Sequence, residues 1–352
     1  MRGKRFSWMG STAVGAFTAL AMVLLFVTGV SAADVYQMKI QSAYPRGDVS
    51  MELLNDMAKW ADEQSNGRIK IRVFADPEIV PAEQLFEATQ KGLLDMVHTV
   101  AAMWGGIVPV GEVEFGLPFA YNIPGELPIA ESSGKVRDFF LNSGFADLLR
   151  QEYGKHGLYW LDMHSYGTLF VLSTKEIKQC SDLKGMKFRA EGAWSTYFDM
   201  LGAPGTFIAG TETYMGLKLG TIDGAIWDVS AITALKWHEV APYWIIGGGN
   251  DVVPGQIIMN MKTWNSLPDD LKQVMKDVAE KYYHELLRLH EGEMDKVAKL
   301  VDEGKVKKVH LTDACRKKHE EAAYKLWDEI AQRDPAAAKG VEMIKKWRET
   351  LQ

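Results

Sequence analysis

The chain has 352 residues, 46 of them acidic and 40 basic, so its formal net charge is -6. With 47% hydrophobic and 24% charged residues it has the composition of a folded globular protein, which excludes a disordered or low-complexity chain. The acidic excess argues against a nucleic-acid partner, and two cysteines are too few for a cysteine-ligated metal site or a disulfide scaffold.

The N-terminus has the pattern of a secretory signal peptide. Basic residues open the chain, and an uncharged apolar stretch follows at 13–30. Small residues then offer a cleavage site, so residues 1–33 are expected to be removed from an exported protein. The alternative is an uncleaved anchor, because 18 residues approach the length of a membrane span. In an oxidising compartment Cys180 and Cys315 could pair, but the sequence leaves this open.

Strands and helices alternate after the signal peptide. A strand with period-two alternation at 36–42 precedes a helix at 51–64, whose apolar residues share one face. A strand at 68–74, a helix at 81–91 and a buried strand at 93–100 follow. This order of elements predicts an α/β fold with a mainly parallel sheet.

An internal repeat predicts two lobes. Gly92-Leu-Leu-Asp95 has a partner in Gly220-Thr-Ile-Asp223, and in both a glycine ends a helix before an apolar strand. We therefore expect lobe I at 34–155 and lobe II at 156–250. Residues 251–352 are expected to return to lobe I and to form a long connecting helix and the C-terminal helices.

The longest helical pattern begins at Pro268 and continues to about Asp302. Its roughly 33 residues would span about 50 Å, which is too long for one small domain, so this helix is expected to brace both lobes. Amphipathic helices are also expected at 138–153, 314–332 and 335–350.

No segment has the pattern of a catalytic site. His284-Glu285-Leu-Leu-Arg288 resembles a zinc-protease helix, but an arginine replaces the second histidine, which favours a solvated charged face. The sequence contains no Gly-x-Ser-x-Gly motif and no phosphate-binding glycine loop. A binding protein is therefore favoured over an enzyme, and a periplasmic enzyme acting on organic acids is the alternative.

The most specific segment of the chain lies between residues 183 and 230, where several short motifs follow one another. These motifs are Leu183-Lys-Gly-Met-Lys-Phe-Arg189, Ile208-Ala-Gly210 and the Gly220-Thr-Ile-Asp223 turn with Trp227 after it. Together with Ser42-Ala-Tyr-Pro45 they resemble the solute-binding subunits of tripartite ATP-independent periplasmic (TRAP) transporters, of the dicarboxylate-receptor superfamily. The resemblance extends over nearly all of 35–350 and is strongest to the branch linked to 2-oxo acids and to mannitol or chloroaromatic compounds.

This resemblance implies a two-lobed periplasmic binding protein fold, similar to type II. It also implies that an organic acid binds in the cleft between the lobes and is delivered to membrane permease subunits. A binding protein for another transporter or for signalling is an alternative that the sequence separates only through the resemblance. Some relatives in this branch exchange a terminal helix, so a homodimer through 335–352 is a further expectation.

The family holds the carboxylate of its ligand with an arginine at the place of Arg189, which is therefore the expected anchor. A guanidinium group matches a carboxylate bidentately and stays charged when enclosed. An arginine that ends a strand also faces the crevice where α/β proteins bind ligands. The alternative is a surface charge or a pair with Glu191. Trp227 is expected to supply a second ligand contact, against the alternative of a core tryptophan.

A metal ion is less strongly indicated. The 2-oxo acid branch binds one through a carboxylate just before this tryptophan, where the chain has Ile226. Asp228 would share the face of Ile226 and could substitute, whereas Thr168 replaces a glutamine ligand and is a poorer one. Asp228, Trp227 and Thr168 are therefore the candidate residues around a Ca²⁺ or Na⁺ ion that bridges the ligand.

Aromatic residues are expected to line the remainder of the cleft. Tyr44 and Trp104 would come from lobe I and Trp194 from lobe II, and ordinary packing is the alternative for each. Aromatic walls favour a flat or aromatic acid. Since no second cationic residue stands out, a monocarboxylate is expected.

Overall fold

The computed structural model describes residues 34–123, 128–249 and 252–351. Residues Val35–Gln352 form one compact unit, to which the description below is confined. The predicted signal peptide at 1–33 lies outside the described residues. A helix with the length and hydrophobicity of a membrane span is not found among the residues described.

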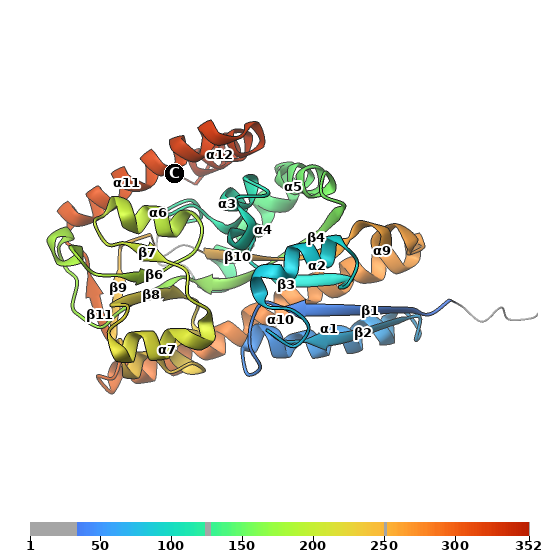
Figure 1. The fold of residues 1–352 in the computed structure, drawn as a ribbon, viewed down its shortest axis with the longest axis horizontal. Coiled ribbons are helices and arrows are strands. Elements are labelled where there is room, and N and C mark those ends of the chain that lie inside the picture. Colours follow the sequence, from blue (N-terminus) through green and yellow to red (C-terminus); the bar gives the residue numbers. More distant parts are fainter. Residues whose placement is uncertain (1–33, 124–127, 250–251, 352) are drawn as a thin grey trace, which may run out of the picture. The chain divides into compact units, whose positions relative to one another are not determined.

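Two β-sheets form the framework of this unit (Figure 1). Sheet A has the strand order β2-β1-β3-β10-β4, and sheet B has the order β11-β9-β5-β8-β6-β7. The strands are β1 Tyr36–Ser42, β2 Ile69–Phe74, β3 Met96–Thr99, β4 Leu158–Thr168, β5 Phe170–Ser173, β6 Phe188–Arg189, β7 Gly205–Thr206, β8 Gly224–Trp227, β9 Tyr243–Ile246, β10 Val252–Asn260 and β11 Lys307–His310.

Both sheets are mixed, so the prediction of a mainly parallel sheet was wrong for the strands that cross between them. β10 runs antiparallel to β3 and β4, and β5 runs antiparallel to β8 and β9. Parallel neighbours need a long crossover, usually through a helix. β5 instead follows β4 after one residue and enters sheet B directly.

The described helices are arranged around these sheets. They are α1 Val49–Gln64, α2 Leu85–Gln90, α3 Val110–Phe115, α4 Ile129–Asn142, α5 Phe145–Gly154, α6 Ala193–Met200, α7 Gly210–Leu219, α8 Ser230–Thr233, α9 Met261–Ser266, α10 Asp269–Asp302, α11 Asp313–Arg333 and α12 Pro335–Glu349, with 3₁₀ turns at Ala82–Gln84, Ala101–Trp104, Cys180–Leu183 and Trp237–Glu239. The helix predicted at 138–153 is two helices, because Gly144 takes a left-handed φ of 88° between α4 and α5.

The two sheets divide the chain at other positions than the predicted lobe boundaries. β4 stays in sheet A to Thr168, so the chain first crosses to sheet B at Leu169 and not near residue 156. β10 returns to sheet A as predicted, but β11 then joins sheet B. The segment 251–352 therefore contributes to both halves of the unit.

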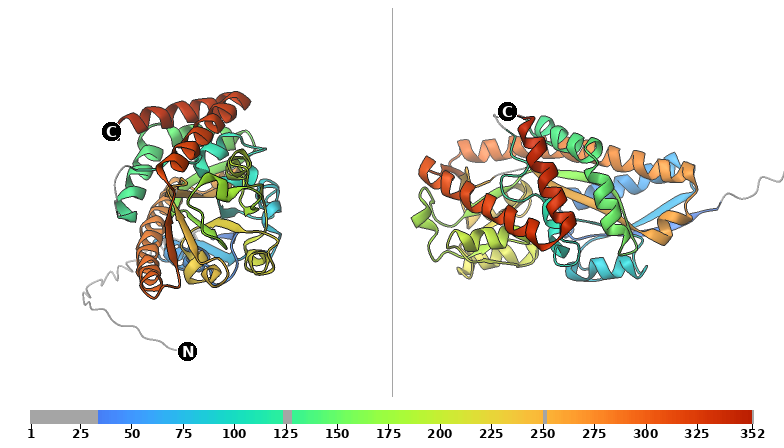
Figure 2. Two further views of the ribbon diagram at one scale, coloured as in Figure 1. Left: turned by 90° about the vertical axis from the view of Figure 1, so that its left-hand side faces the viewer. Right: turned by 90° about the horizontal axis from the view of Figure 1, so that it is seen from above.

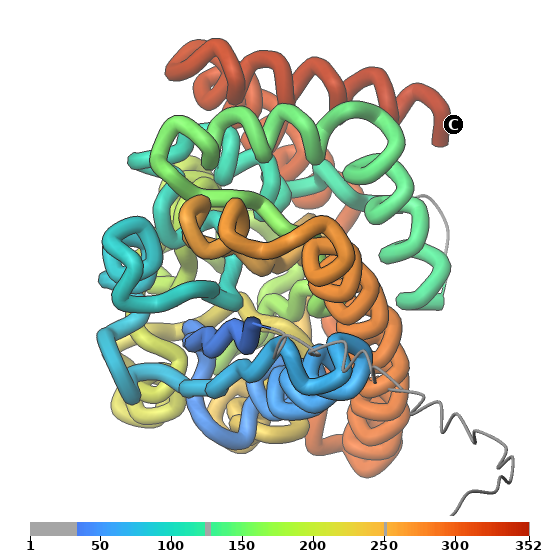
Figure 3. Tube along the Cα trace, turned by 90° about the vertical axis from the view of Figure 1, so that its right-hand side faces the viewer, coloured from blue at the N-terminus to red at the C-terminus, as the bar shows by residue number. Residues whose placement is uncertain are grey.

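The long helix is confirmed as α10, which has 34 residues. It packs against α1 and β4 on the side of sheet A and reaches α8, which follows β8 of sheet B. Figure 3 shows α10 in orange beside α1 in blue. Because α10 contacts elements of both halves, it spans them as the sequence analysis predicted.

The C-terminal helices connect the two halves a second time. α11 packs against α6, and α12 packs against α3 and α5, as the views in Figure 2 show in red and green. Cys180 and Cys315 form a disulfide bond with a Cα–Cα distance of 5.2 Å, which settles the pairing that the sequence left open. The disulfide fixes the N-terminal end of α11 to the 3₁₀ turn that begins at Cys180.

Candidate functional site

A cavity of about 250 Å³ lies between the two halves of the unit. Its walls come from segments that follow β1, β2 and β3 and from segments around β6, α7 and β8. The lining residues are Ala43, Tyr44, Asp76, Pro77, Pro81, Ala82, Glu83, Val100 and Met103 on the first wall and Arg189, Glu191, Phe207, Ala209, Gly210, Thr211 and Trp227 on the second. A smaller cavity of about 20 Å³ continues from it and adds Tyr166 and Asp228.

Arg189 ends β6 and is 2% exposed. Its Nε donates to the carbonyl of Ile208 at 3.0 Å. Its Nη1 donates to the carbonyl of Ile226 at 3.2 Å and to Oε1 of Glu191 at 3.1 Å. Within the part of the chain that the structure describes, Nη2 makes no hydrogen bond. Nε and Nη1 thus hold the guanidinium group in place, and Nη2 is left as a charged donor of a residue that lines the cavity.

Trp227 forms the surface on which this guanidinium group lies. The centre of the guanidinium group is 4.5 Å from the centroid of the Trp227 ring, a distance typical of a cation–π contact. The indole Nε1 donates to Oγ of Ser230 at 3.0 Å, which fixes the plane of the ring. A Cβ atom on Gly210 would come within 2.8 Å of the indole, so glycine is needed here for the ring to pack against α7.

A hydrogen bond between the two halves lies close to Glu191 in the sequence. Glu112 of α3 accepts a hydrogen bond from the backbone N–H of Ala193, the first residue of α6, at 2.5 Å. A Cβ atom on Gly192 would meet the same carboxylate at 2.8 Å. Burial raises the pKa of Glu112, and the Ala193 hydrogen bond lowers it. This contact joins α3 to the loop that carries Glu191.

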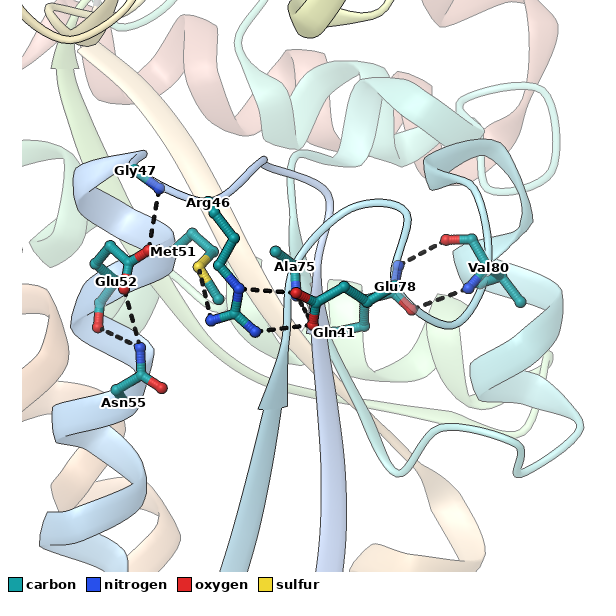
Figure 4. Close-up of polar contacts among 9 residues, drawn as sticks. All are labelled: Gln41, Arg46, Gly47, Met51, Glu52, Asn55, Ala75, Glu78 and Val80. Carbon is teal, nitrogen blue, oxygen red and sulfur yellow. Dashed lines mark hydrogen bonds and ion pairs between the residues drawn. The ribbon is translucent and has the colours of Figure 1, made fainter.

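The opposite wall is a loop that follows β2, and its shape is fixed from two sides (Figure 4). The side-chain amide of Gln41 donates to the carbonyl of Val80 and accepts from its N–H, at 2.6 and 3.2 Å. Arg46 holds Glu78 through two hydrogen bonds of 2.8 Å. The loop therefore presents Asp76 and the residues after it to the cavity in a defined position.

Tyr44 lies between the two cavities and contacts both halves. Its ring packs against Tyr166 at 5.2 Å and edge-on against Trp227 at 5.7 Å. Burial raises the pKa of Tyr44 well above its usual value, and the charge of Glu191 raises it further. The phenol is therefore neutral at physiological pH and serves as an aromatic wall with a hydroxyl donor.

The sequence of this chain matches the model of a known protein family. Residues 40–334 match the family of bacterial extracellular solute-binding proteins, family 7. The chain belongs to this family. Its members are solute-binding proteins and not enzymes, which confirms the prediction of a binding protein and places the protein outside the cytoplasm.

Relatives of this solute-binding protein cover nearly its whole length. A monocarboxylate 2-oxoacid-binding periplasmic protein of Nostoc sp. is 23% identical, with 97% of this chain and 93% of the relative aligned. Solved structures of TRAP periplasmic solute-binding proteins from Pseudoalteromonas atlantica and Colwellia psychrerythraea both superpose with a TM-score of 0.82. They are 24% and 23% identical, and each alignment covers 90% of this chain and 95% of the other. These likenesses confirm the two-lobed α/β fold.

The two solved structures hold sodium with pyruvate and calcium with pyruvate, respectively. In this chain the residues that could hold such an ion are Glu191 and Asp228, which both line the smaller cavity. Oδ1 of Asp228 already accepts the N–H of Ser230 at 2.7 Å. Ca²⁺ takes about six to eight oxygen ligands, so most would have to come from the bound acid, water or the backbone. The carboxylates fit an ion, but they form only part of its shell.

Asp228 belongs to a buried acidic group that joins the halves. Ser230 Oγ donates to Asp48, the N-cap of α1, at 3.4 Å. Burial and the nearby charge of Asp48 raise the pKa of Asp228 to about 7. Sequence reasoning missed Asp48, because its partner lies 182 residues away.

Trp104, Trp194 and Thr168 were expected in the cleft, but none of them lines either of the two cavities. Trp104 is buried in the core and donates to the hydroxyl of Tyr153. Trp194 is also buried and donates to the carbonyl of Gly116. Thr168 pairs with Val252 at the end of β4. Of the other expected residues, Arg189, Trp227 and Tyr44 line the larger cavity and Asp228 lines the smaller one.

Proposed function

We propose that this protein captures an organic acid in the cavity between sheets A and B and delivers it to the membrane permease subunits of a TRAP transporter. The observation that carries the proposal is the open Nη2 of Arg189 at the cavity wall. A buried guanidinium group with an unused donor is matched by a carboxylate oxygen. Family membership and relatives that bind monocarboxylates support the same assignment.

The remaining residues orient the acid. Trp227 and Tyr44 enclose its apolar part, and Phe207 lies 5.7 Å from the Arg189 guanidinium, from the centre of the guanidinium group to the ring centroid. The contacts Glu112–Ala193 and Asp48–Ser230 cross between the halves. We propose that these contacts form when the halves close on the ligand by a hinge motion at the crossings between sheets A and B.

The location is proposed together with the function. Residues 1–33 would direct export and be cleaved, which leaves the solute-binding protein in the periplasm. N-terminal sequencing of the protein recovered from a periplasmic extract tests this: a start near residue 34 is expected, and an intact N-terminus in the membrane fraction contradicts it. A homodimer through α12 stays a prediction, and light scattering of the mature protein tests it.

The ligand is found by a thermal-shift screen of the mature protein against monocarboxylates, dicarboxylates, aromatic acids and sugars. A ligand that binds only the folded state raises the melting temperature according to its affinity and concentration. Each acid is tested in EDTA and in added Ca²⁺ or Na⁺, which shows whether an ion bridges it.

The proposal is then tested by titration calorimetry of the acid found. Arg189→Ala is expected to lose about 2–3 kcal/mol of binding free energy, because the carboxylate loses its charge-assisted hydrogen bonds. The matched control is Arg316→Ala, which removes an exposed arginine of α11 away from the cavity. A shift from neutral sugars alone, or equal affinity of wild type and Arg189→Ala, would contradict the proposal.

A further inference from the structure

The charges that line the cavity do not suit a plain anion. Arg189 is the one basic residue among the lining residues, and Asp76, Glu83 and Glu191 are acidic. Glu191 already forms an ion pair with Arg189, with 3.1 Å between its Oε1 and Nη1 of the arginine. A simple monocarboxylate would therefore add a negative charge to a cavity that has an excess of them.

Asp76 and Glu83 lie on the wall opposite Arg189 and have no cation of their own. Among the described residues neither takes part in an ion pair, whereas Glu78 on the same loop is neutralised by Arg46. Burial raises the pKa of Asp76, and the charge of Glu83 raises it further. The two carboxylates are thus close enough to repel each other, and nothing in the described chain compensates them.

Asp76 is also held in a fixed position. Its backbone N–H donates to the carbonyl of Tyr44 at 3.0 Å, and its side chain accepts from the N–H of Ala82. Its Oδ1 is buried and has no hydrogen-bond partner. Asp76 is half-buried and Glu83 is exposed, and both face the cavity without a cation among the described residues. A positive charge on the ligand would therefore be favoured beside them.

A bare metal ion is a poorer match for this wall than a charged group on the ligand. Divalent ions need several oxygens that converge on one point. Among the described residues, one group of three side chains is spaced so that it could share a metal ion: Cys180, Cys315 and His319. None of the three lines the cavity. Asp76, Glu83 and Glu191 do not form such a group among the described residues.

We propose that the ligand is an organic acid that also carries a cationic group of the ammonium type. Its carboxylate binds Arg189, and its cationic group is received by Asp76 and Glu83. This inference rests on the proposed function and specifies the substrate class of the same site. It also narrows the expected monocarboxylate to an acid with one carboxylate and one positive charge, such as an amino acid or a betaine.

The test compares pairs of acids that share a carbon skeleton, one with and one without an amino group. Affinities are measured by titration calorimetry in EDTA, for wild type and for Asp76→Asn with Glu83→Gln. We expect the amino-bearing member of the matching pair to bind wild type at least about tenfold tighter, and the double variant to lose this preference. Glu176→Gln, an exposed acid outside the cavity, is the control.

The outcomes separate this inference from the proposed function. Equal or tighter binding of the plain acids by wild type overturns the inference and leaves the carboxylate site standing. Plain acids that bind tightly only with added Ca²⁺ also overturn it, because the acidic wall would then serve a metal. If no acid binds the wild-type protein, or if Arg189→Ala does not change the affinity of an acid that binds, the proposed function itself is overturned. The melting temperature of the double variant confirms that it is folded.

Discussion

Arg137 and Arg189 are two buried arginines that lie on aromatic rings, yet only one of them lines the cavity. Arg137 of α4 binds both oxygens of Asp162, at 2.6 and 3.1 Å, and the carbonyl of Met163 at 3.0 Å. It lies 4.3 Å from the ring centroid of Tyr283. Arg189 meets one carboxylate oxygen and two carbonyls and leaves Nη2 open at the cavity.

The difference shows how the same residue type serves stability in one place and binding in another. A bidentate partner satisfies the guanidinium of Arg137 within the chain. At Arg189 the partner is two residues along in sequence, and its single contact leaves a donor for a ligand. Burial and an aromatic ring are common to both sites, so neither identifies the binding arginine. What distinguishes Arg189 from Arg137 is a hydrogen-bond donor that is unused and lies beside a cavity.

The largest expected effect is on stability and concerns Arg137. Arg137→Ala leaves the carboxylate of Asp162 buried without its cation, so the free energy of unfolding should fall by about 3–5 kcal/mol. Urea unfolding measures this. Ligand affinity of the folded fraction should be unchanged. Loss of affinity with little loss of stability would assign Arg137 to the site and break the comparison.

The second prediction concerns the shape of the charged group. Arg189→Lys keeps the charge but loses the fork and the carbonyl hydrogen bonds, so binding should weaken by about 1–2 kcal/mol with a smaller change in stability. Titration calorimetry of the variant measures it. Unchanged affinity would show that the site needs a positive charge and not a guanidinium group.

A buried carboxylate without an arginine provides the third prediction. Glu114 accepts hydrogen bonds from Trp160 and Tyr153, and burial raises its pKa to about 8. Because the folded pKa lies above the unfolded value of 4.5, this group stabilises the fold at low pH, and that stability is lost as the pH rises from 4.5 to about 8.

Glu114→Gln should remove this dependence. The slope of unfolding free energy against pH should become shallower by up to about 1.4 kcal/mol per pH unit between pH 5 and 8. Denaturant titrations at several pH values test this, with Glu176→Gln as the exposed control. Identical slopes for Glu114→Gln and wild type would mean that Glu114 is ionised throughout this range.

The smallest expected effect concerns the aromatic rings. A methyl group at Gly210 would contact the Trp227 indole at 2.8 Å and shift it. Gly210→Ala should weaken ligand binding by about 1 kcal/mol, because the surface under the guanidinium moves. Tryptophan fluorescence and calorimetry measure it. Full affinity would show that the position of Trp227 is not critical.

The sequence predicts well what depends on neighbours along the chain. The 34-residue α10 follows from a helical pattern that only Gly292 interrupts. The place of Arg189 at the end of a strand follows from the family motif that it ends. Gly144 was passed over because a helix pattern tolerates a single glycine. The reversed direction of β5 and β10 depends on which sheet each strand joins, and a strand pattern does not carry that information.

The site residues that sequence reasoning missed come together only in three dimensions. Asp76 and Glu83 follow β2, more than 100 residues before Arg189. Trp104 and Trp194 look like cleft aromatics, but the groups that hold their indole N–H lie 49 and 78 residues away in the core. The charge of the opposite wall and the partners of an indole are therefore properties of the fold.

The most direct test of the account is a crystal structure of the mature protein with the organic acid that the screen identifies. The account predicts that a carboxylate oxygen of the ligand lies within hydrogen-bond distance of Nη2 of Arg189, with the guanidinium still on the Trp227 ring. A ligand bound elsewhere, or one in the cavity whose carboxylate points away from Arg189, would contradict it.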